Sequence, residues 1–282
     1  MALDKLVDSS QLDSNLTSIA NAIRTKGGTS AQLAFPQGFV DAVEAIETGG
    51  SGYTVDEIGT VNGISGALVF NGRIKRASAF AGCTGITSVV INSSDQGIVG
   101  NVFQNCTNLV SVTDNNTTEF GNDYFNGCTK LTTLVAPKLV HVSARALRST
   151  KIRYLVLPDG GFIWNTGCGS CTSLIGADFG YKFTAGTIEA NAFSGASSMN
   201  ILIWRYNGSG VPQLKNISAF ANTPFASGKA GGTLYVPQAK ITEFTQATNW
   251  STILGYANNQ ILPIEGSIYE TQYVDGTPIP TT

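Results

Sequence analysis

Few residues in this sequence have the types and spacing that chemistry requires. Cys168 and Cys171 form a C-x-x-C pair, which serves in other proteins as half of a zinc site or as a redox pair. The chain has no second C-x-x-C, and His141 is its only histidine. Four of the five cysteines, Cys171 among them, recur at one position of a repeated phrase, which indicates a tight core position. We therefore predict no metal, no cofactor and no catalytic residue.

Acidic and aromatic side chains suggest two further kinds of site. Asp114, Glu119 and Asp123 lie close in sequence and carry the oxygen ligands that Ca²⁺ prefers, although Asp in turns more often hydrogen-bonds to nearby backbone. Exposed aromatic rings can stack on sugar rings. The repeat register places Trp204 in the core. The aromatic candidates for such a platform are Tyr154, Trp164, Trp204 and Tyr206.

A phrase that returns seven times sets the positions of these residues. Its aromatic, or the residue that replaces the aromatic, recurs every 22 or 23 residues in the first four copies. A period this short indicates a solenoid, in which one strand-and-turn unit cannot bury its apolar face alone. We predict a mainly β protein, a β-solenoid of about seven coils with 22–25 residues each. The seven positions are Phe80, Phe103, Phe125, Leu147, Cys168, Phe193 and Phe220.

The strand in each copy has two different faces. Apolar residues alternate along one face, which we predict to lie in the core. The opposite face carries a single charge over six strands, whereas a solvated sheet normally carries several. A ligand, a partner subunit or the chain's own segment 254–282 would cover it, unless β-branched residues are there for strand propensity. The candidate binding surface comprises Val90, Thr113, Val135, Tyr154, Val156, Ile201 and Ile203, with Trp164 in a nearby loop.

Pattern changes divide the chain into four parts. Residues 1–48 carry two apolar stripes at helical spacing, which predict a helical module for attachment or oligomerisation. Residues 49–78 are expected to form a linker and an N-terminal cap, 79–230 the solenoid, and 231–282 a C-terminal cap and tail. The stripe residues are Leu12, Leu16, Ile19, Ile23, Phe39, Val43 and Ile46.

Composition excludes several classes of function. The net charge is −2, which does not favour nucleic acid or anionic lipid as a partner. No apolar run is long enough to cross a membrane, so we predict no membrane insertion. The N-terminus lacks the apolar core of a secretory signal, and we expect the chain to be made in the cytoplasm.

The repeated phrase F-x-[GN]-C-T-x-L-x-x-[VL] resembles the BspA-type leucine-rich repeat over roughly residues 74–264. The closing stretch LYVP…ITEF…ATNW…ILPIE is similar to the end of such proteins. The resemblance implies a leucine-rich-repeat solenoid and brings no catalytic residues. Copies five to seven depart from the pattern, since Cys168 replaces the Phe and Ala196 replaces the Cys.

The stretch LDSNLTSIANAIRTKGGTSAQLAFPQGFVDAVEAI, within residues 8–46, resembles a short module of phage tail and baseplate proteins. The resemblance implies a virion structural protein of a tail, baseplate or fibre, located in the phage tail. Residues 1–48 would bind other tail proteins, and the repeats would recognise a host-surface glycan or protein. A homo-oligomer is expected, with a trimer favoured by analogy with tail fibres. The alternatives are a bacterial cell-surface adhesin or interaction protein and, third, a tail-associated glycan hydrolase.

Deletion of residues 1–48 is expected to leave a folded monomer and to abolish assembly, because the apolar stripes that would join the copies are then absent. Light scattering measures the molar mass of the full and shortened chains. An unchanged mass contradicts the assigned role of these residues.

Overall fold

The computed structural model divides the chain into two compact units, residues 1–54 and 55–282. Of the helices predicted within 1–48 the structure describes only Thr17 and Asn21, both helical and exposed. The stripe residues lie outside the described residues, as does most of the predicted linker and N-terminal cap. Two short strands are assigned ahead of the repeats, β1 (Thr54–Val55) and β2 (Val61–Asn62). The side chains that the structure describes lie in residues 64–70, 74, 77–92, 99–181 and 186–280, apart from two isolated positions near the N-terminus.

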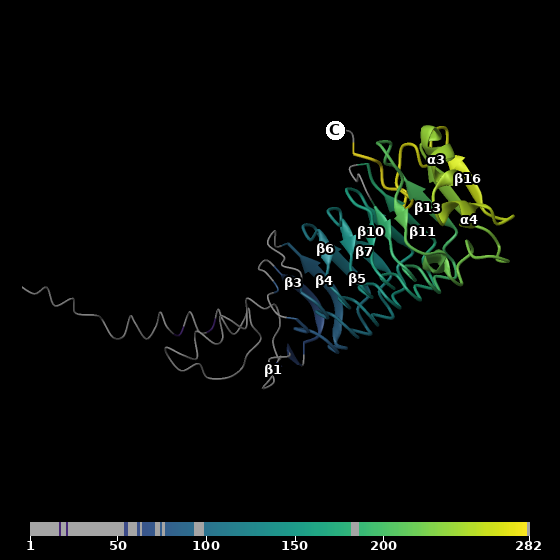
Figure 1. The fold of residues 1–282 in the computed structure, drawn as a ribbon. Helices are drawn as coiled ribbons and strands as arrows, with labels where there is room; N and C mark the ends of the chain where they lie inside the picture. The colour runs from purple at the N-terminus through teal and green to yellow at the C-terminus, as the bar shows by residue number, and fades with distance from the viewer. Residues whose placement is uncertain are drawn as a thin grey trace, which may run out of the picture. The chain divides into compact units, whose positions relative to one another are not determined.

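The described residues from β3 to β16 form a parallel β-solenoid, as the repeat predicts. One long side of the coils is built from a four-stranded and a five-stranded sheet, in which neighbouring strands run parallel and follow chain order. Figure 1 shows these strands stacked side by side from β3 to β16. The strands are β3 (Gly66–Phe70), β4 (Ile86–Ile91), β5 (Ser111–Asp114), β7 (Thr133–Val135), β9 (Tyr154–Leu157), β11 (Gly176–Phe179), β13 (Ile201–Trp204), β15 (Thr233–Val236) and β16 (Gln260–Pro263).

A second parallel sheet forms another side of the coils. Its strands have two residues each, and the second residue of every strand is buried. The polypeptide thus alternates between the two sheets once per coil, which encloses a narrow core between them. The strands are β6 (Glu119–Phe120), β8 (His141–Val142), β10 (Phe162–Ile163), β12 (Thr187–Ile188) and β14 (Gln213–Leu214).

The repeated aromatic residue forms a stack through the core. The rings of Phe80 and Phe103 lie 5.3 Å apart and nearly parallel, and Phe103 and Phe125 continue the stack at 5.5 Å. Leu147 and Cys168 interrupt the rings, and both are fully buried. Stacking begins again between Phe193 and Phe220, at 5.6 Å. The order of the coils is therefore held by contacts between equivalent residues.

The cysteine position is explained by a hydrogen bond between coils. The Cys106 thiol donates to the carbonyl of Phe80 at 3.1 Å, and the Cys128 thiol donates to Phe103 at 3.0 Å. Cys171 makes the same bond to Leu147, so it is the repeat cysteine, while Cys168 fills the aromatic position. The residue before the cysteine position has a positive φ in every copy, and five of the seven are glycine or asparagine, which adopt it most readily. These residues are Gly82, Asn105, Gly127, Ser149, Ser170, Gly195 and Asn222.

All five cysteines are expected to resist thiol reagents in the native protein at mildly alkaline pH. Each is a buried thiol, and burial raises their pKa values, for example that of Cys171 to about 11. The reactive thiolate is therefore scarce as well as shielded. Absorbance after addition of Ellman's reagent measures this, with denatured protein as the control that releases all five. Rapid native modification would contradict the assignment of these residues to the core.

Two short helices follow the last repeat. They are α3 (Ile241–Gln246) and α4 (Trp250–Leu254), after the 3₁₀ turns η1 (Ile217–Phe220) and η2 (Gln238–Lys240). Phe244 and Trp250 pack edge to face and are buried, and the Trp250 indole donates to the carbonyl of Pro212 at 2.8 Å. The helices thus cover the end of the core that a further coil would otherwise cover. None of the described helices is long and apolar enough to span a membrane.

Candidate functional site

The outward-facing side chains of β3 to β16 define a surface that we name the strand face. After β16 the chain returns over this surface as an irregular segment, residues 264–280, which we name the strap. Figure 1 shows the strap as the yellow trace that leads to the C-terminus. Ile203 on β13 forms a buried cluster with Ile264 and Val274 of the strap, and side chains of β9, β13 and β15 pack around it. The chain therefore covers part of its own strand face.

Gly176 on β11 makes room for the strap. A Cβ atom at this position would lie 2.7 Å from a methyl carbon of Val274. The single glycine among the outward residues of these strands is thus explained by the close approach of the strap.

A buried ion pair holds the strap to the strand face. Asp178 on β11 and Arg205, directly after β13, form two hydrogen bonds of 2.8 and 2.7 Å, and both side chains are fully buried. The guanidinium also donates to the carbonyls of Tyr269 and Gln272, each at 2.6 Å. The Val274 amide donates to the Asp178 carboxylate at 3.0 Å. Three hydrogen bonds thus join the pair to the strap backbone.

The environment of this pair is strongly desolvating. Burial raises the pKa of Asp178 to about 6, although the hydrogen bonds from Arg205 act in the opposite direction. The carboxyl is therefore mainly ionised at neutral pH. The Arg205 guanidinium lies 5.0 Å from the centre of the Tyr273 ring and 5.8 Å from that of Tyr181, which adds two cation–π contacts.

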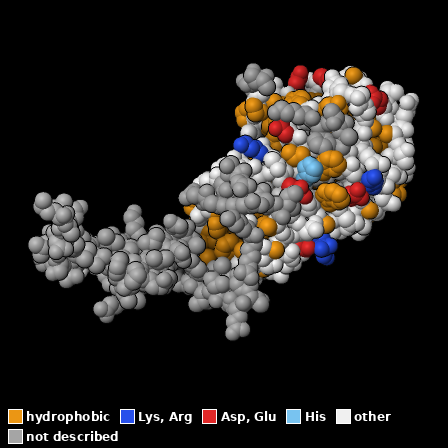
Figure 2. Space-filling view, turned by 60° about the vertical axis from the view of Figure 1, so that its left-hand side comes forward, with side chains coloured by type: hydrophobic (Ala, Val, Ile, Leu, Met, Phe, Trp, Pro, Cys, Tyr) orange, Lys and Arg blue, Asp and Glu red, His pale blue; other side chains and the backbone are white. Residues whose placement is uncertain are grey.

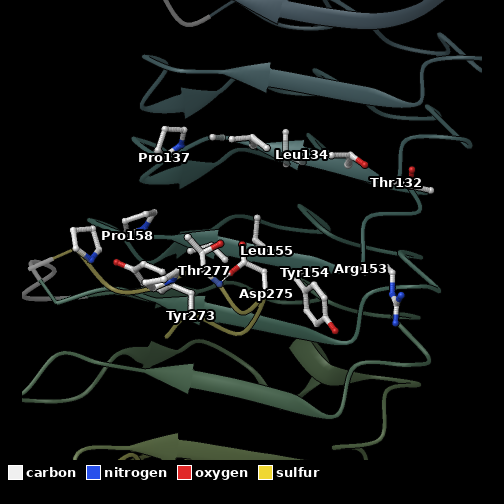
Figure 3. A pocket seen from close by; sticks show the side chains of 16 residues that line it. Thr132, Leu134, Pro137, Arg153, Tyr154, Leu155, Pro158, Tyr273, Asp275 and Thr277 are labelled. Carbon is white, nitrogen blue, oxygen red and sulfur yellow. Dashed lines mark hydrogen bonds between the residues drawn. The ribbon is translucent and has the colours of Figure 1, made fainter. Parts of the chain in front are cut away.

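A groove opens between β7, β9 and the strap. Its volume is about 460 Å³. The outward residues Val135, Tyr154 and Val156 form part of its lining, and the strap contributes the opposite wall. Figure 3 shows Tyr154 on its strand and Tyr273 on the strap among the side chains that line the groove. The remaining lining residues are Thr132, Thr133, Leu134, Ala136, Pro137, Arg153, Leu155, Pro158, Asp275, Thr277, Pro278 and Pro280.

One cationic side chain, Arg153, lines one end of this groove, and two lysines lie on the same two coils. Figure 3 shows Arg153 at one end of the strands and Pro137 and Pro158 at the other. Lys130 and Lys151 occupy equivalent positions in successive coils, each directly before the first inward residue of its coil. Arg153 lies two residues after Lys151 in the sequence. The two lysines donate to neutral side chains, and in the part of the chain that the structure describes none of the three has a carboxylate partner. We name Lys130, Lys151 and Arg153 the basic edge.

The structure brings three of the eight predicted surface residues together in the groove: Val135, Tyr154 and Val156. Val90 and Thr113 lie half-buried on the same face, in register with Val135. Ile201 is half-buried and packs against the strap cluster. The remaining two residues, Ile203 and Trp164, have different surroundings.

The assignment of Ile203 to an exposed binding surface was wrong. Its side chain is fully buried, because Ile264 and Val274 cover it. Trp164 is 48% exposed but follows β10, in the second sheet, and therefore does not belong to the strand face. Trp204 lies in the core, as the register predicted, and contacts Gly161 and Gly186 closely.

The acidic residues that suggested a calcium site form separate bonds. Asp114 accepts hydrogen bonds from the amides of Asn116 and Thr117. Glu119 accepts from the Ser143 hydroxyl, and Asp123 pairs with Arg145. Among the residues that the structure describes, no three His, Cys, Asp or Glu side chains lie close enough to hold a metal ion.

The single histidine lies in ordinary surroundings. The His141 ring on β8 lies 4.7 Å from the ring of Phe162 on β10. Figure 2 shows the histidine, in pale blue, beside hydrophobic side chains. Cys168 and Cys171 are instead fully buried in the core, where the Cys171 thiol bonds to the carbonyl of Leu147. Both cysteines therefore serve the repeat, and the C-x-x-C spacing is a product of its register.

Several residues of the site were missed from the sequence. Arg205 and the strap residues Tyr273 and Val274 come from distant parts of the chain, and no periodic pattern links them to the strand face. One signal was present, since Asp178 is the only charge among the outward residues of six strands. An isolated charge on an apolar face requires a partner when it is buried.

Comparisons with known proteins found solved structures that are similar to this chain. A leucine-rich repeat protein from Bacteroides ovatus ATCC 8483 is similar, with 18% identity, a TM-score of 0.43, and coverage of 65% of this chain and 58% of that one. A leucine rich cell surface protein from Faecalibacterium prausnitzii A2-165 has 11% identity, a TM-score of 0.27, and coverage of 82% and 96%. This chain spans less than two thirds of the Bacteroides structure. No curated protein is significantly similar to it.

The repeats themselves match a family model, described as the BspA type leucine rich repeat region. Six copies match, over residues 73–168 and 113–227, which together cover more than half of the chain. The stacked phenylalanines, the cysteine bonds and the positive-φ turns give this match its physical basis. The chain therefore belongs to the BspA-type leucine-rich-repeat family.

Proposed function

We propose that this protein is a non-enzymatic, cell-surface leucine-rich-repeat interaction protein that acts in adhesion and binds its ligand in the groove. The observation that carries the proposal is the convergence of Val135, Tyr154 and Val156 in one groove, beside strap residues that the repeat pattern does not include. Concave, mainly apolar sites with a few polar groups are the usual form of binding sites. Among the residues that the structure describes, Asp275 is the single carboxylate lining this groove, and glycan hydrolysis requires a pair of acids.

Replacement of Val135 by aspartate is expected to abolish adhesion and to leave stability nearly unchanged. The Val135 side chain is 46% exposed and lies in the groove lining, so a charge there opposes an apolar ligand without disturbing the core. Binding of the labelled full chain to bacterial and epithelial cells, measured by flow cytometry, tests this expectation.

The chain offers a matched control for this variant. Val69 lies on the same face, is 47% exposed, and is four strands away from β9 in chain order. Val69→Asp is expected to bind cells normally. Trp164→Ala tests the second sheet in the same assay. Equal binding by wild type and Val135→Asp would contradict the groove as the adhesion site.

A second candidate function is a phage tail protein with the same groove as its receptor-binding site. It is favoured by the resemblance of residues 8–46 to a tail and baseplate module. We place the cell-surface function first because family membership rests on the described repeats, whereas this resemblance rests on a short stretch outside them. Copies arranged on a tail would add avidity to a weak single site.

Immunogold electron microscopy separates the two locations. Antibody to residues 53–282 is applied to a source culture induced to release phage. Gold on cell envelopes with unlabelled particles supports the cell-surface proposal, and gold on tail tips supports the phage protein. Release of reducing sugar from wall polysaccharide by the purified chain would instead favour a hydrolase.

A further inference from the structure

The sheet on the strand face is interrupted at the groove. One ladder joins β3, β4, β5 and β7, a second joins β9 to β16, and in the described chain no ladder joins β7 to β9. Figure 3 shows the space between the strand with Leu134 and the strand with Tyr154. The coils stay connected on either side, through the Lys151 amide to Leu131 at 2.8 Å and the Phe162 amide to Val140 at 3.3 Å.

The interruption leaves two strand edges facing the groove. The inward residues Leu134 and Leu155 also line it, which shows that the strands separate enough for the groove to reach their backbones. Unpaired strand edges present main-chain donors and acceptors, and these groups pair readily with an extended polypeptide. The four prolines and two tyrosines of the lining, beside three threonines, Arg153 and Asp275, suit the mixed apolar and polar side chains of a polypeptide.

The strap is an example of what the strand face accepts. It is an irregular polypeptide that packs Val274 and Tyr269 against the outward residues of β9 to β15. Its wall of the groove ends at Pro278 and Pro280, and beyond it Val135, Thr113 and Val90 continue the same surface in register. A second polypeptide in the groove would therefore pack beside the strap and extend the surface over which the strap contacts the strand face.

Charge determines which polypeptide fits. Arg153 of the basic edge lines the groove, whereas the ammonium groups of Lys130 and Lys151, on the same two coils, bond to Asn108 and Thr172. None of the three has a carboxylate partner in the described chain. The Arg153 guanidinium lies 5.8 Å from the centre of the Tyr154 ring, so the edge adjoins the apolar lining directly. A ligand with acidic residues at one end gains attraction there and is guided to the groove.

We propose that the groove binds an extended segment of another polypeptide, with apolar side chains between β7, β9 and the strap, and acidic residues at the basic edge. This inference deepens the proposed function and rests on it. Main-chain hydrogen bonds to the free strand edges supply part of the affinity, and the side chains supply the specificity.

Selection from a displayed library of random dodecapeptides on the full chain tests the class of ligand. We expect enrichment of peptides with a cluster of Asp or Glu next to apolar or aromatic residues. Anisotropy of one selected, fluorescein-labelled peptide then gives its affinity. A selection that yields only neutral or basic peptides, or none, overturns the proposal, as does binding of polygalacturonate without any selected peptide.

Two substitution sets test the basic edge with the same peptide. Combining Lys130→Gln, Lys151→Gln and Arg153→Gln is expected to weaken binding about tenfold and to reduce its salt dependence. The control combines Arg148→Gln, Lys215→Gln and Lys229→Gln, which removes three exposed cations elsewhere. Equal affinities of the two variants contradict the assigned charge contact.

Methylation of alternate backbone nitrogens of the peptide tests the strand edges. We expect loss of binding when the methylated set faces β7 or β9, and retention for the opposite set. Retained binding by both sets overturns the backbone pairing.

Failure of this inference can be distinguished from failure of the proposed function. If Val135→Asp stops cell adhesion while the selected peptides lack acidic residues, only this inference fails. If that variant adheres normally, the proposed function fails as well.

Discussion

Replacement of Arg205 by methionine is expected to lower the free energy of unfolding by about 3–5 kcal/mol, the range for removing one partner of a buried ion pair. The substitution leaves the Asp178 carboxylate without its two guanidinium bonds, and it removes both bonds to the strap carbonyls. Chemical denaturation measures the stability. Hydrogen exchange and limited proteolysis of residues 264–280 measure release of the strap.

A second variant separates the cost of an unpaired charge from the role of the pair. Combining Asp178→Leu with Arg205→Met removes both charges, and replacement of a whole buried pair by apolar residues is often neutral or stabilising. We expect the double variant to recover much of the lost stability while the strap still exchanges faster than in the wild type. A stable Arg205→Met protein with a protected strap contradicts the importance of this ion pair.

The strap also forms a wall of the groove, so its release has a functional consequence. Tyr273, Asp275 and Pro278 move away with it, while Val135 and Tyr154 stay on the strands. The double variant is therefore expected to bind the selected peptide more weakly than the wild type despite its recovered stability. Binding and stability are thereby distinguished in one protein.

Replacement of Phe103 by alanine is expected to lower the free energy of unfolding by about 3–5 kcal/mol, as large-to-small changes at buried aromatic positions do. The ring is fully buried and contacts four other rings, including Phe80 and Phe125 above and below it in the stack. Each coil depends on its neighbours, so the cavity weakens contacts on both sides. Denaturation in urea gives the change in midpoint.

The control for this variant is Trp164→Ala. It also removes a large aromatic ring, but the Trp164 side chain is 48% exposed and lies outside the core stack. We expect its effect on the free energy of unfolding to be much smaller. Similar losses for the two variants would contradict a core built on the repeated phenylalanines.

The repeat pattern determined most of the solenoid, because each of its positions has a local physical cause. The Phe stacks on the equivalent ring of the next coil, the residue before the cysteine takes a positive φ, and the cysteine donates to the previous coil. These contacts join residues about one repeat apart. They therefore appear in the sequence as a period of 22 or 23 residues.

The outward face of the strands was predicted in part. Its apolar character correctly indicated a covered surface, and the register placed Val135, Tyr154 and Val156 on it. The chain's own segment 254–282 was one of the covers considered, and residues 264–280 of it cover part of the face. The pattern could not choose among the possible covers, because the strap has no repeat and no periodicity. Ile203 therefore belonged to the predicted exposed surface, although Ile264 and Val274 bury it.

The sequence by itself thus determined the coils, their core and the outward direction of the candidate residues, since period-two and repeat spacing act over short distances. Tertiary structure alone decided the position of the strap, the pairing of Asp178 with Arg205, and the break between β7 and β9 that opens the groove. These features depend on contacts between residues up to 96 positions apart, such as the Val274 amide and Asp178. Contacts of that separation leave no spacing in the sequence.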